Sequence, residues 1–310
     1  MADFFQTQAW WDFQRELGEE VVHASGDGWH YFGRMVKDAV GTYLYLPYGP
    51  VVASEQALDD AVEHAKVQAR ELGAYRLLLE PSLPITPAQA EARFATQRLG
   101  FQPSRSQIVH LAQSEEDIIK GMSTTRRKQH RGAERKGMTF SESRDREDYE
   151  TGVRLLRESG EAKSFFVRDE DYFDKFRVAL FEPGIAKIFV GRFEGDIHIV
   201  AFVIDDADTR YYLYVGRDLS NNSLQISAPL ISHMILDAKA QGLKEFDLFG
   251  ISASDDVEDD MTGFTVFKRT FGGETVQYAG TWEIPLKVGR YAARRVIDTV
   301  EKLRHARNSE

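Results

Sequence analysis

The sequence predicts a mixed α/β protein built from two similar lobes, and three observations support that fold class. Segments with strand spacing alternate with amphipathic segments of helical spacing along all 310 residues. The order hairpin, strand, helix, strand, helix occurs twice, as a repeat of architecture rather than of sequence. The length is enough for about two domains of roughly 150 residues each.

Turn and capping residues delimit the elements of the first lobe. Its strands are apolar segments bounded by turns, and its helices begin at residues typical of helix N-termini, such as Ser54. We expect helices at residues 5–13, 54–72 and 86–100. We expect strands at about residues 20–25, 29–37, 42–47 and 75–80.

The second lobe opens with a strand, two helices, a second strand and two more helices, and then returns to the order of the first lobe. We expect its strands at about residues 107–111, 138–143, 186–193, 197–204, 210–215, 245–248 and 275–284. We expect a short helix that begins at Ser114, further helices at residues 124–136, 147–159, 170–181, 225–240 and 264–271, and a basic helix after Pro285. This order matches two tandem GNAT-like (acetyltransferase-like) domains, each a mixed twisted sheet flanked by helices. The predicted domains are residues 1–104, completed by 278–310, and residues 105–277.

Composition and charge exclude several classes of protein. The chain has no cysteine, which excludes disulfides, thiolate catalysis and cysteine metal sites. No apolar run approaches the ~20 residues of a membrane span, and the N-terminus does not resemble a signal peptide, so we expect a cytoplasmic protein. A net charge of −10 argues against general nucleic-acid coating. Basic residues nevertheless crowd into residues 126–136 and 287–307, which indicates local anion binding.

A single lysine among aromatic residues marks the candidate active site. The apolar segment 246–250 is followed by an acidic loop, residues 252–260, and then by Lys268 beside Phe264, Phe267 and Phe271. A partly desolvated cation is a stronger electrostatic group than one in water. In the alternative interpretation, the three phenylalanines at i, i+3 and i+7 form a core face and the lysine only extends beside it.

Several motifs occur in a characteristic order along the chain. They are Phe5-Gln6 with Trp10, Tyr48-Gly49-Pro50-Val51, Thr125-Arg126-Arg127 with residues 131–137, Tyr212-Leu213-Tyr214-Val215-Gly216, Phe246-Asp247-Leu248-Phe249-Gly250, Phe267-Lys268 with Phe271-Gly272, and Tyr278-Ala279-Gly280-Thr281-Trp282-Glu283. Taken together, these motifs resemble the Fem family (FemABX) of aminoacyl-tRNA-dependent peptidyltransferases that form peptidoglycan bridges. The resemblance covers nearly the whole chain and is to compact members without a coiled-coil arm.

The resemblance implies an aminoacyltransferase. It would move an amino acid from aminoacyl-tRNA, a co-substrate rather than a cofactor, to the stem-peptide amine of a peptidoglycan precursor (UDP-MurNAc-pentapeptide or lipid II). The ester is already activated, so such an enzyme mainly positions the reactants and stabilises an oxyanion. Lys268 matches the family's catalytic lysine, with the oxyanion or the leaving ribose oxygen as its target. Phe267 is expected beside the tRNA terminus, or alternatively in the core.

Substrate-binding residues follow from the same resemblance. Arg127 and Arg131 lie four residues apart on one helix face, which suits bidentate phosphate binding, although a solvated basic face is the alternative. Tyr214 matches an aromatic residue of the family's substrate cleft. Tyr212, Tyr48 and Asp247 are further candidates, and Glu283 is another polar group for the site.

One departure from the family pattern, the partner of the C-terminal helix and two rival functions remain open. Val51-Val52-Ala53 stands where some members have an acid. The C-terminal basic helix has tRNA phosphates or, for a lipid-linked substrate, the inner membrane leaflet as its expected partner, with a solvated basic face as the alternative. An acyl-CoA-dependent N-acyltransferase is the first rival, but Gln129-His130-Arg131-Gly132-Ala133-Glu134 departs from its pyrophosphate loop. A noncatalytic tRNA- or membrane-binding module is the second. The histidines and the acidic loop show no metal-ligand spacing, so we expect no metal.

Overall fold

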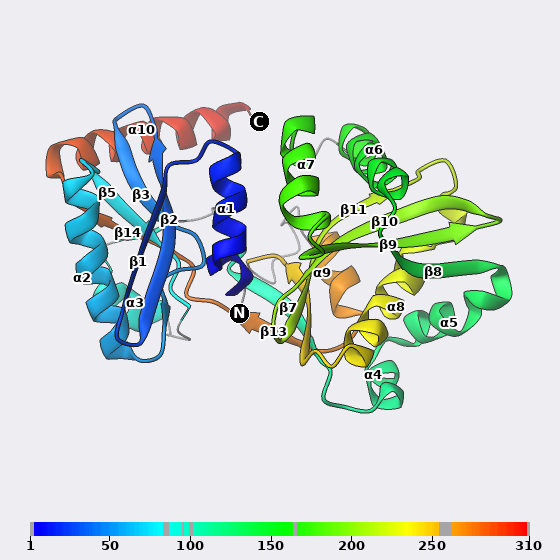
Figure 1. Ribbon diagram of the computed structural model, residues 1–310. Coiled ribbons are helices and arrows are strands. Elements are labelled where there is room, and N and C mark those ends of the chain that lie inside the picture. Colours follow the sequence, from blue (N-terminus) through cyan, green and yellow to red (C-terminus); the bar gives the residue numbers. More distant parts are fainter. Residues whose placement is uncertain are drawn as a thin grey trace. The chain divides into compact units, whose positions relative to one another are not determined.

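The chain forms two compact units, each with one mixed β-sheet and flanking helices, in a computed structural model (Figure 1). The structure describes residues 3–82, 87–94, 96–98, 102–163, 166–253 and 262–308. Unit 1 comprises residues 1–104 and 277–310, and unit 2 comprises residues 105–276. Segments from both ends of the sequence therefore build unit 1.

Unit 1 is organised around a seven-stranded sheet that the last strand of the chain completes. Its strands are β1 (Val21–Gly26), β2 (Trp29–Lys37), β3 (Thr42–Leu46), β4 (Val51–Val52), β5 (Arg76–Leu79), β6 (Thr96–Arg98) and β14 (Thr281–Pro285). Its helices are η1 (Asp3–Gln6), α1 (Gln8–Glu16), α2 (Glu55–Glu71), α3 (Pro87–Arg93) and α10 (Val288–Asn308). The strand order is β1-β2-β3-β5-β14-β6, with β4 paired to β2.

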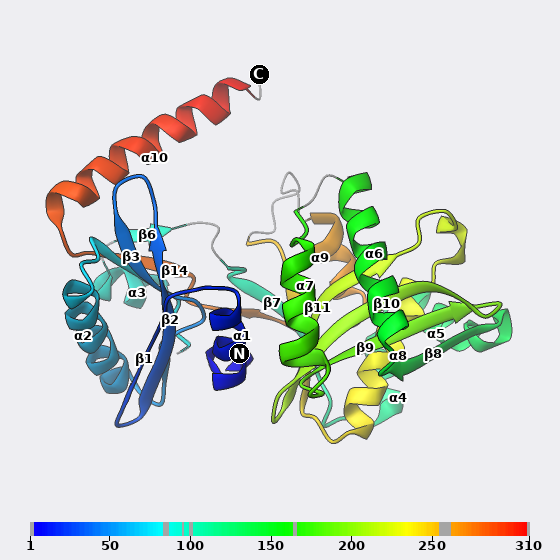
Figure 2. The same ribbon diagram turned by 45° about the horizontal axis from the view of Figure 1, so that its top comes forward.

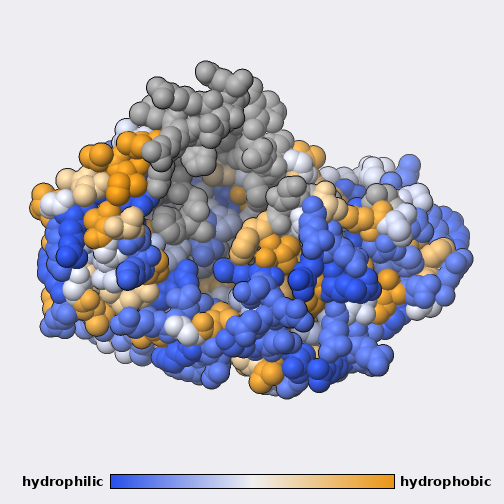
Figure 3. All heavy atoms as spheres, turned by 90° about the horizontal axis from the view of Figure 1, so that it is seen from above, coloured by the Kyte–Doolittle hydropathy of each residue, from blue (hydrophilic) through white to orange (hydrophobic). Residues whose placement is uncertain are grey.

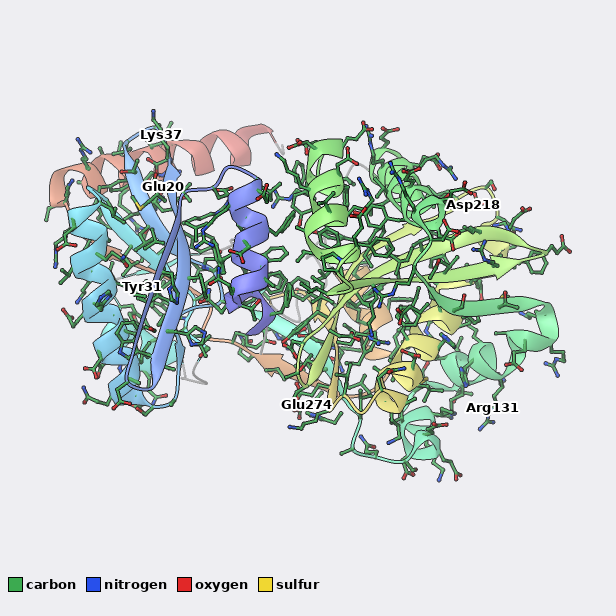
Figure 4. All side chains as sticks on the ribbon, in the orientation of Figure 1. Glu20, Tyr31, Lys37, Arg131, Asp218 and Glu274 are labelled. Atoms are coloured by element: carbon green, nitrogen blue, oxygen red, sulfur yellow. The ribbon has the colours of Figure 1, made fainter. Side chains whose placement is uncertain are left out.

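Alternation along β2 attaches helices to both faces of this sheet. Tyr31 points toward α2 (Figure 4), and its hydroxyl donates to Gln68 Oε1 of that helix at 2.7 Å. The ring of the next residue, Phe32, stacks instead on Trp11 of α1. α2 begins at the predicted cap, because Ser54 Oγ accepts from the backbone N–H of Ala57 at 3.1 Å.

Unit 2 has a second seven-stranded sheet, of order β13-β7-β12-β11-β10-β9-β8. Its strands are β7 (Arg105–His110), β8 (Met138–Ser143), β9 (Ala186–Phe193), β10 (Asp196–Asp205), β11 (Thr209–Arg217), β12 (Glu245–Gly250) and β13 (Glu274–Gln277). Its helices are α4 (Glu115–Gly121), α5 (Thr124–Gly132), η2 (Glu134–Lys136), α6 (Arg146–Lys163), α7 (Glu170–Phe176), the π-turn η3 (Arg177–Phe181), η4 (Asn222–Leu224), α8 (Ser227–Ala240) and α9 (Thr262–Arg269).

The two sheets share one pattern of pairing. In unit 1 an antiparallel run β1-β2-β3 leads through α2 to β5, which is parallel to β3. In unit 2 the antiparallel run β9-β10-β11 leads through α8 to β12, which is parallel to β11. The predicted fold class, two tandem mixed sheets flanked by helices, is therefore confirmed.

Two predicted elements are wrong, both where a distant strand decides the structure. The helix expected over residues 86–100 ends at Arg93, and Thr96–Arg98 instead forms β6, which pairs with β14. The single strand expected over residues 275–284 is two strands in different sheets, β13 and β14. Between them Gly280 adopts a φ of 79°, a left-handed conformation that suits glycine and turns the chain out of one sheet.

Candidate active site

A cavity of about 910 Å³ lies within unit 2. It is lined by residues of α5, α6, β11, the start of α8, the end of β12 and α9, together with Phe166. Lys268, Phe267, Tyr212 and Tyr214 are among its lining residues, so the structure brings four of the predicted site residues together.

The cavity exists because two neighbouring parallel strands separate. β11 and β12 pair only where Thr209–Tyr211 faces Glu245–Asp247. Beyond that point the next residues of β11, Tyr212 to Val215, line the cavity. A bulge opposite Phe202 and Val203 of β10 leaves Leu213 outside the ladder and increases the local twist. Ligand sites of open α/β sheets commonly lie at such carboxyl ends of strands.

Lys268 lies in the last turn of α9 and is held by the backbone at the end of β12. Its Nζ donates to the carbonyl oxygens of Phe249 at 3.0 Å and of Gly250 at 2.7 Å. Phe249 has a φ of 63°, which is uncommon for a residue with a side chain and costs free energy. Burial lowers the pKa of Lys268 to about 8, although the negative charge of Asp247 opposes this shift.

Asp247 supports this turn from the core and does not line the cavity. It is 1% exposed, and one carboxylate oxygen accepts from the Ser106 hydroxyl and from the Phe249 N–H, the latter at 2.7 Å. Burial raises the pKa of Asp247, whereas both hydrogen bonds oppose the shift. The carboxylate thereby holds the backbone whose carbonyl oxygens bind Lys268.

Aromatic side chains form the apolar part of the wall. The Tyr214 hydroxyl lies 2.9 Å from that of Tyr172, and its ring packs edge-on against Phe173 and Phe202. Phe267 packs at an angle on Phe271, which is fully buried. Phe264 is 51% exposed, so the expected core face of three phenylalanines is wrong at that position. The residue instead lines the cavity.

Helix α5 contributes Arg126 to the cavity rather than the two arginines that the sequence singles out. The Arg126 Nε donates to Thr270 Oγ1 at 2.8 Å, and its guanidinium carbon lies 4.7 Å from the Phe267 ring centroid. Among the described residues no carboxylate lies within ion-pair distance of Arg126 or Lys268. Gln129, one turn further along α5, also lines the cavity.

Arg127 and Arg131 do not line this cavity. The Arg127 guanidinium donates to the backbone carbonyls of Lys120, at 2.9 Å, and Met122, and so caps the end of α4. Arg131 is exposed and points outward from unit 2 (Figure 4). Their expected role in phosphate binding stays a prediction.

The remaining predicted candidates lie in unit 1 or outside the described residues. Tyr48 is buried, its ring is stacked on Phe5, and its N–H donates to Glu80 Oε2 at 2.9 Å. Glu283 is fully buried and pairs with Arg76 at 2.9 Å. Most of the expected acidic loop, residues 254–260, lies outside the described residues.

Sequence reasoning missed Arg126, Gln129 and Phe249. The first two share a helix face at i and i+3, which a search for polar pairs on α5 would have found. No sequence signal marks the left-handed conformation of Phe249. The assembled group combines one desolvated cation, a second guanidinium and an aromatic wall, which suits an anionic or charge-developing substrate beside planar or apolar groups.

Comparison with known proteins connects this site to a family. A model of the FemAB family matches residues 194–299, a range that contains β11, β12 and α9. A lipid II:glycine glycyltransferase of Staphylococcus saprophyticus is 27% identical over 169 residues, which make up 49% of this chain and 40% of that protein. A protein of the same name from Staphylococcus haemolyticus is 26% identical over 183 residues, 54% of this chain and 42% of its own. The matches thus span about two fifths of these relatives.

Solved structures resemble the chain over a greater length. A crystal structure of FemX has a TM-score of 0.82 at 19% identity, and 94% of each chain is covered. The C-terminal domain of a putative lysylphosphatidylglycerol synthetase from Agrobacterium fabrum has a TM-score of 0.62 at 15% identity, and the match covers 95% of this chain and 92% of that domain. At these identities the likeness describes the fold. The family model and the two glycyltransferase relatives thus show that part of this chain, including the strands and the helix of the site, is similar to the FemAB family.

Proposed function

We propose that the protein transfers an amino acid from aminoacyl-tRNA to the stem-peptide amine of a peptidoglycan precursor during bridge synthesis. The match of residues 194–299 to the FemAB family model and the names of the two relatives support this reaction. The observation that carries the proposal is Lys268, whose Nζ is fixed by the carbonyl oxygens of Phe249 and Gly250 at the wall of a large cavity.

The geometry of Lys268 suits ester aminolysis. The precursor amine attacks the aminoacyl carbonyl carbon, a tetrahedral oxyanion forms, and the C–O bond to the tRNA ribose breaks as that oxygen takes up a proton. An ammonium group has three N–H donors, and two of them are used by Phe249 and Gly250. The third is available for the oxyanion or for the departing ribose oxygen. A pKa of about 8 keeps the group charged at neutral pH and makes it a better proton donor than an ordinary lysine.

The other cavity residues suit the two substrates. The Arg126 guanidinium, which has no carboxylate partner among the described residues, would bind an anionic group of the precursor or of the tRNA end. Tyr214, Phe267 and the exposed ring of Phe264 offer surfaces for a base or a sugar.

The decisive experiment incubates the protein with a panel of charged tRNAs and with both the UDP-linked and the lipid-linked precursor, and weighs the products by mass spectrometry. We expect the precursor to gain the mass of one amino-acid residue with at least one pair. No gain with any pair would contradict the proposal. Binding of acyl-CoA in calorimetry, without any response to charged tRNA, would favour an acyl-CoA-dependent transferase instead.

A further inference from the structure

One face of α10 is fixed to unit 1. The Tyr291 hydroxyl donates to Glu283 Oε1 at 2.7 Å, and Arg294 pairs with Asp298 along the helix at 2.5 Å. Tyr291 packs against a buried cluster of unit 1 that consists of Tyr43, Tyr45, Tyr75 and Leu78. These contacts determine which way the helix faces over its described side chains, residues 288–300.

The opposite face of α10 is apolar and exposed. Val288 is 81% exposed, Val296 64% and Val300 42%. A helix turns about 100° per residue, which places these valines and Ala292 on one strip, roughly opposite Tyr291 and Arg294. No charged residue falls within this strip between residues 288 and 300.

Basic residues flank the apolar strip. Arg290 and Arg295 are exposed and fall on its two sides by the same helical geometry. Residues 287–308 contain seven lysines and arginines and two acidic residues, whereas the rest of the chain has 32 basic and 47 acidic residues. The protein is acidic as a whole, and this excess of positive charge is confined to the segment that contains α10.

Figures 2 and 3 show where this face lies on unit 1. In Figure 2 the later part of α10 projects beyond the sheet of its own unit. In Figure 3, which looks down on the helix, apolar residues gather where α10 begins. Among the described residues no helix is long and apolar enough to cross a membrane.

We propose that α10 docks in the plane of an anionic membrane surface. An apolar strip between two basic flanks is the pattern of a helix that lies at the headgroup level, with its apolar side chains in the acyl boundary and its cations on anionic lipids. RNA phosphates would attract the arginines equally well, but they give no reason for the exposed valines. The inference goes beyond the proposed transferase activity and does not depend on it.

Vesicle flotation tests the inference without any substrate. The full-length protein is mixed with vesicles of phosphatidylcholine alone, or of phosphatidylcholine with phosphatidylglycerol. We expect it to float with the mixed vesicles and not with the neutral ones. The double variant Val296→Gln/Val300→Gln keeps the charge and favours the helix, and we expect at least about tenfold weaker partitioning because the apolar strip is lost.

The matched control is Val67→Gln, which changes a valine on α2 of the same unit that is 52% exposed. This variant is expected to bind vesicles as the unchanged protein does. Unchanged binding of the double variant would overturn the inference. So would salt-sensitive binding that structured RNA displaces and that ignores the valines, since the partner would then be RNA. Aminoacyl transfer onto a soluble precursor measures the proposed transferase activity separately from membrane docking. The double variant should retain this transfer even though it binds vesicles more weakly.

Discussion

At the scale of single residues, Lys268 combines features that a stable core avoids. A partly buried cation is held by two carbonyl oxygens, one of them on Phe249 in a left-handed conformation, and no described carboxylate lies within ion-pair distance. Local rules that are broken without an evident structural gain are typical of functional sites. The free energy that this arrangement costs should be visible in the stability of the protein.

Lys268→Met separates stability from activity. We expect at least about 100-fold slower aminoacyl transfer, since a fixed donor to the reacting oxygen is lost. Between the folded pKa of about 8 and the ordinary value of 10.5, the unfolded chain binds more protons at this lysine than the folded protein. The free energy of unfolding of the unchanged protein therefore contains a term that rises with pH in this window, by about 3 kcal/mol in all, and the variant lacks it.

Urea unfolding at pH 7 and pH 10 measures this difference. The free energy of unfolding of Lys268→Met, minus that of the unchanged protein, should be larger at pH 7 than at pH 10. Arg269→Met, which removes an exposed cation next along α9, is the matched control and should show neither effect. An identical pH dependence for Lys268→Met and the unchanged protein would mean that the lysine is not desolvated.

Arg126 and Arg127 are neighbours with different contacts, so substitution of the first should affect substrate binding and substitution of the second should affect stability. Arg126→Gln removes a guanidinium from the cavity wall, so we expect the KM for the precursor to rise about tenfold with little change in kcat. Arg127→Gln removes the donors to the Lys120 and Met122 carbonyls, so we expect a loss of about 1 kcal/mol in stability and normal kinetics. Steady-state kinetics and urea unfolding of both variants test this pair, and a raised KM for Arg127→Gln alone would return the phosphate-binding role to Arg127.

This pair also shows where sequence reasoning on the site stops. Helical spacing tells which residues of α5 share a face, such as Arg127 and Arg131. It does not tell which face turns toward a cavity formed by β11 and α9, about 90 and 140 positions further along the chain. Lys268 was singled out by a local signal, a cation among phenylalanines, but that signal also fits a core face, and only the resemblance to the Fem family favoured a catalytic lysine.

At the scale of elements, Gly216 is the residue at which β11 packs closely against α6. A Cβ at this position would lie 2.4 Å from the backbone N of Leu156 and 2.5 Å from the carbonyl oxygen of Gly152. Both atoms belong to the α6 backbone and cannot rotate away. The glycine of the Tyr212–Gly216 motif therefore sets how closely α6 approaches the strand that lines the cavity.

Gly216→Ala should therefore push α6 off the sheet. We expect a loss of about 3 kcal/mol in the free energy of unfolding, typical of overpacking against fixed backbone. Gly121→Ala, at the end of α4 in the same unit, meets no atom within 4 Å and is the control. Chemical denaturation of both variants is the measurement. Equal stability of the two alanine variants would show that α6 can move without cost.

Most elements were predictable because their signals are local. Ser54 and Ser114 accept the N-cap hydrogen bonds expected of them, and the Gly137 turn ends η2 after α5. The errors have a common cause, because β6 and the split between β13 and β14 depend on strands far away in the sequence. Propensity cannot report which sheet a strand joins.

At the scale of the whole molecule, the chain leaves unit 1, builds unit 2 and returns. β14 lies between β5 and β6, so unit 1 needs the C-terminal segment for the interior of its sheet. Unit 2 is continuous in sequence and contains all the described residues that line the 910 Å³ cavity. The two units should therefore respond differently to truncation.

A fragment of residues 105–276 should fold by itself, because its sheet and its main core cluster come from its own residues. A fragment of residues 1–276 lacks β14 and α10, which leaves β5 and β6 without the strand between them, so only unit 2 should remain folded. Both fragments are compared with the full chain by thermal unfolding, followed by circular dichroism, and by the dispersion of their amide resonances in NMR spectra. Fragment 105–276 should unfold in one cooperative transition. Fragment 1–276 should show the same transition, and its additional amide resonances should be those of an unfolded chain. A fragment 105–276 without cooperative unfolding would mean that the cavity with Lys268 depends on unit 1 for its stability.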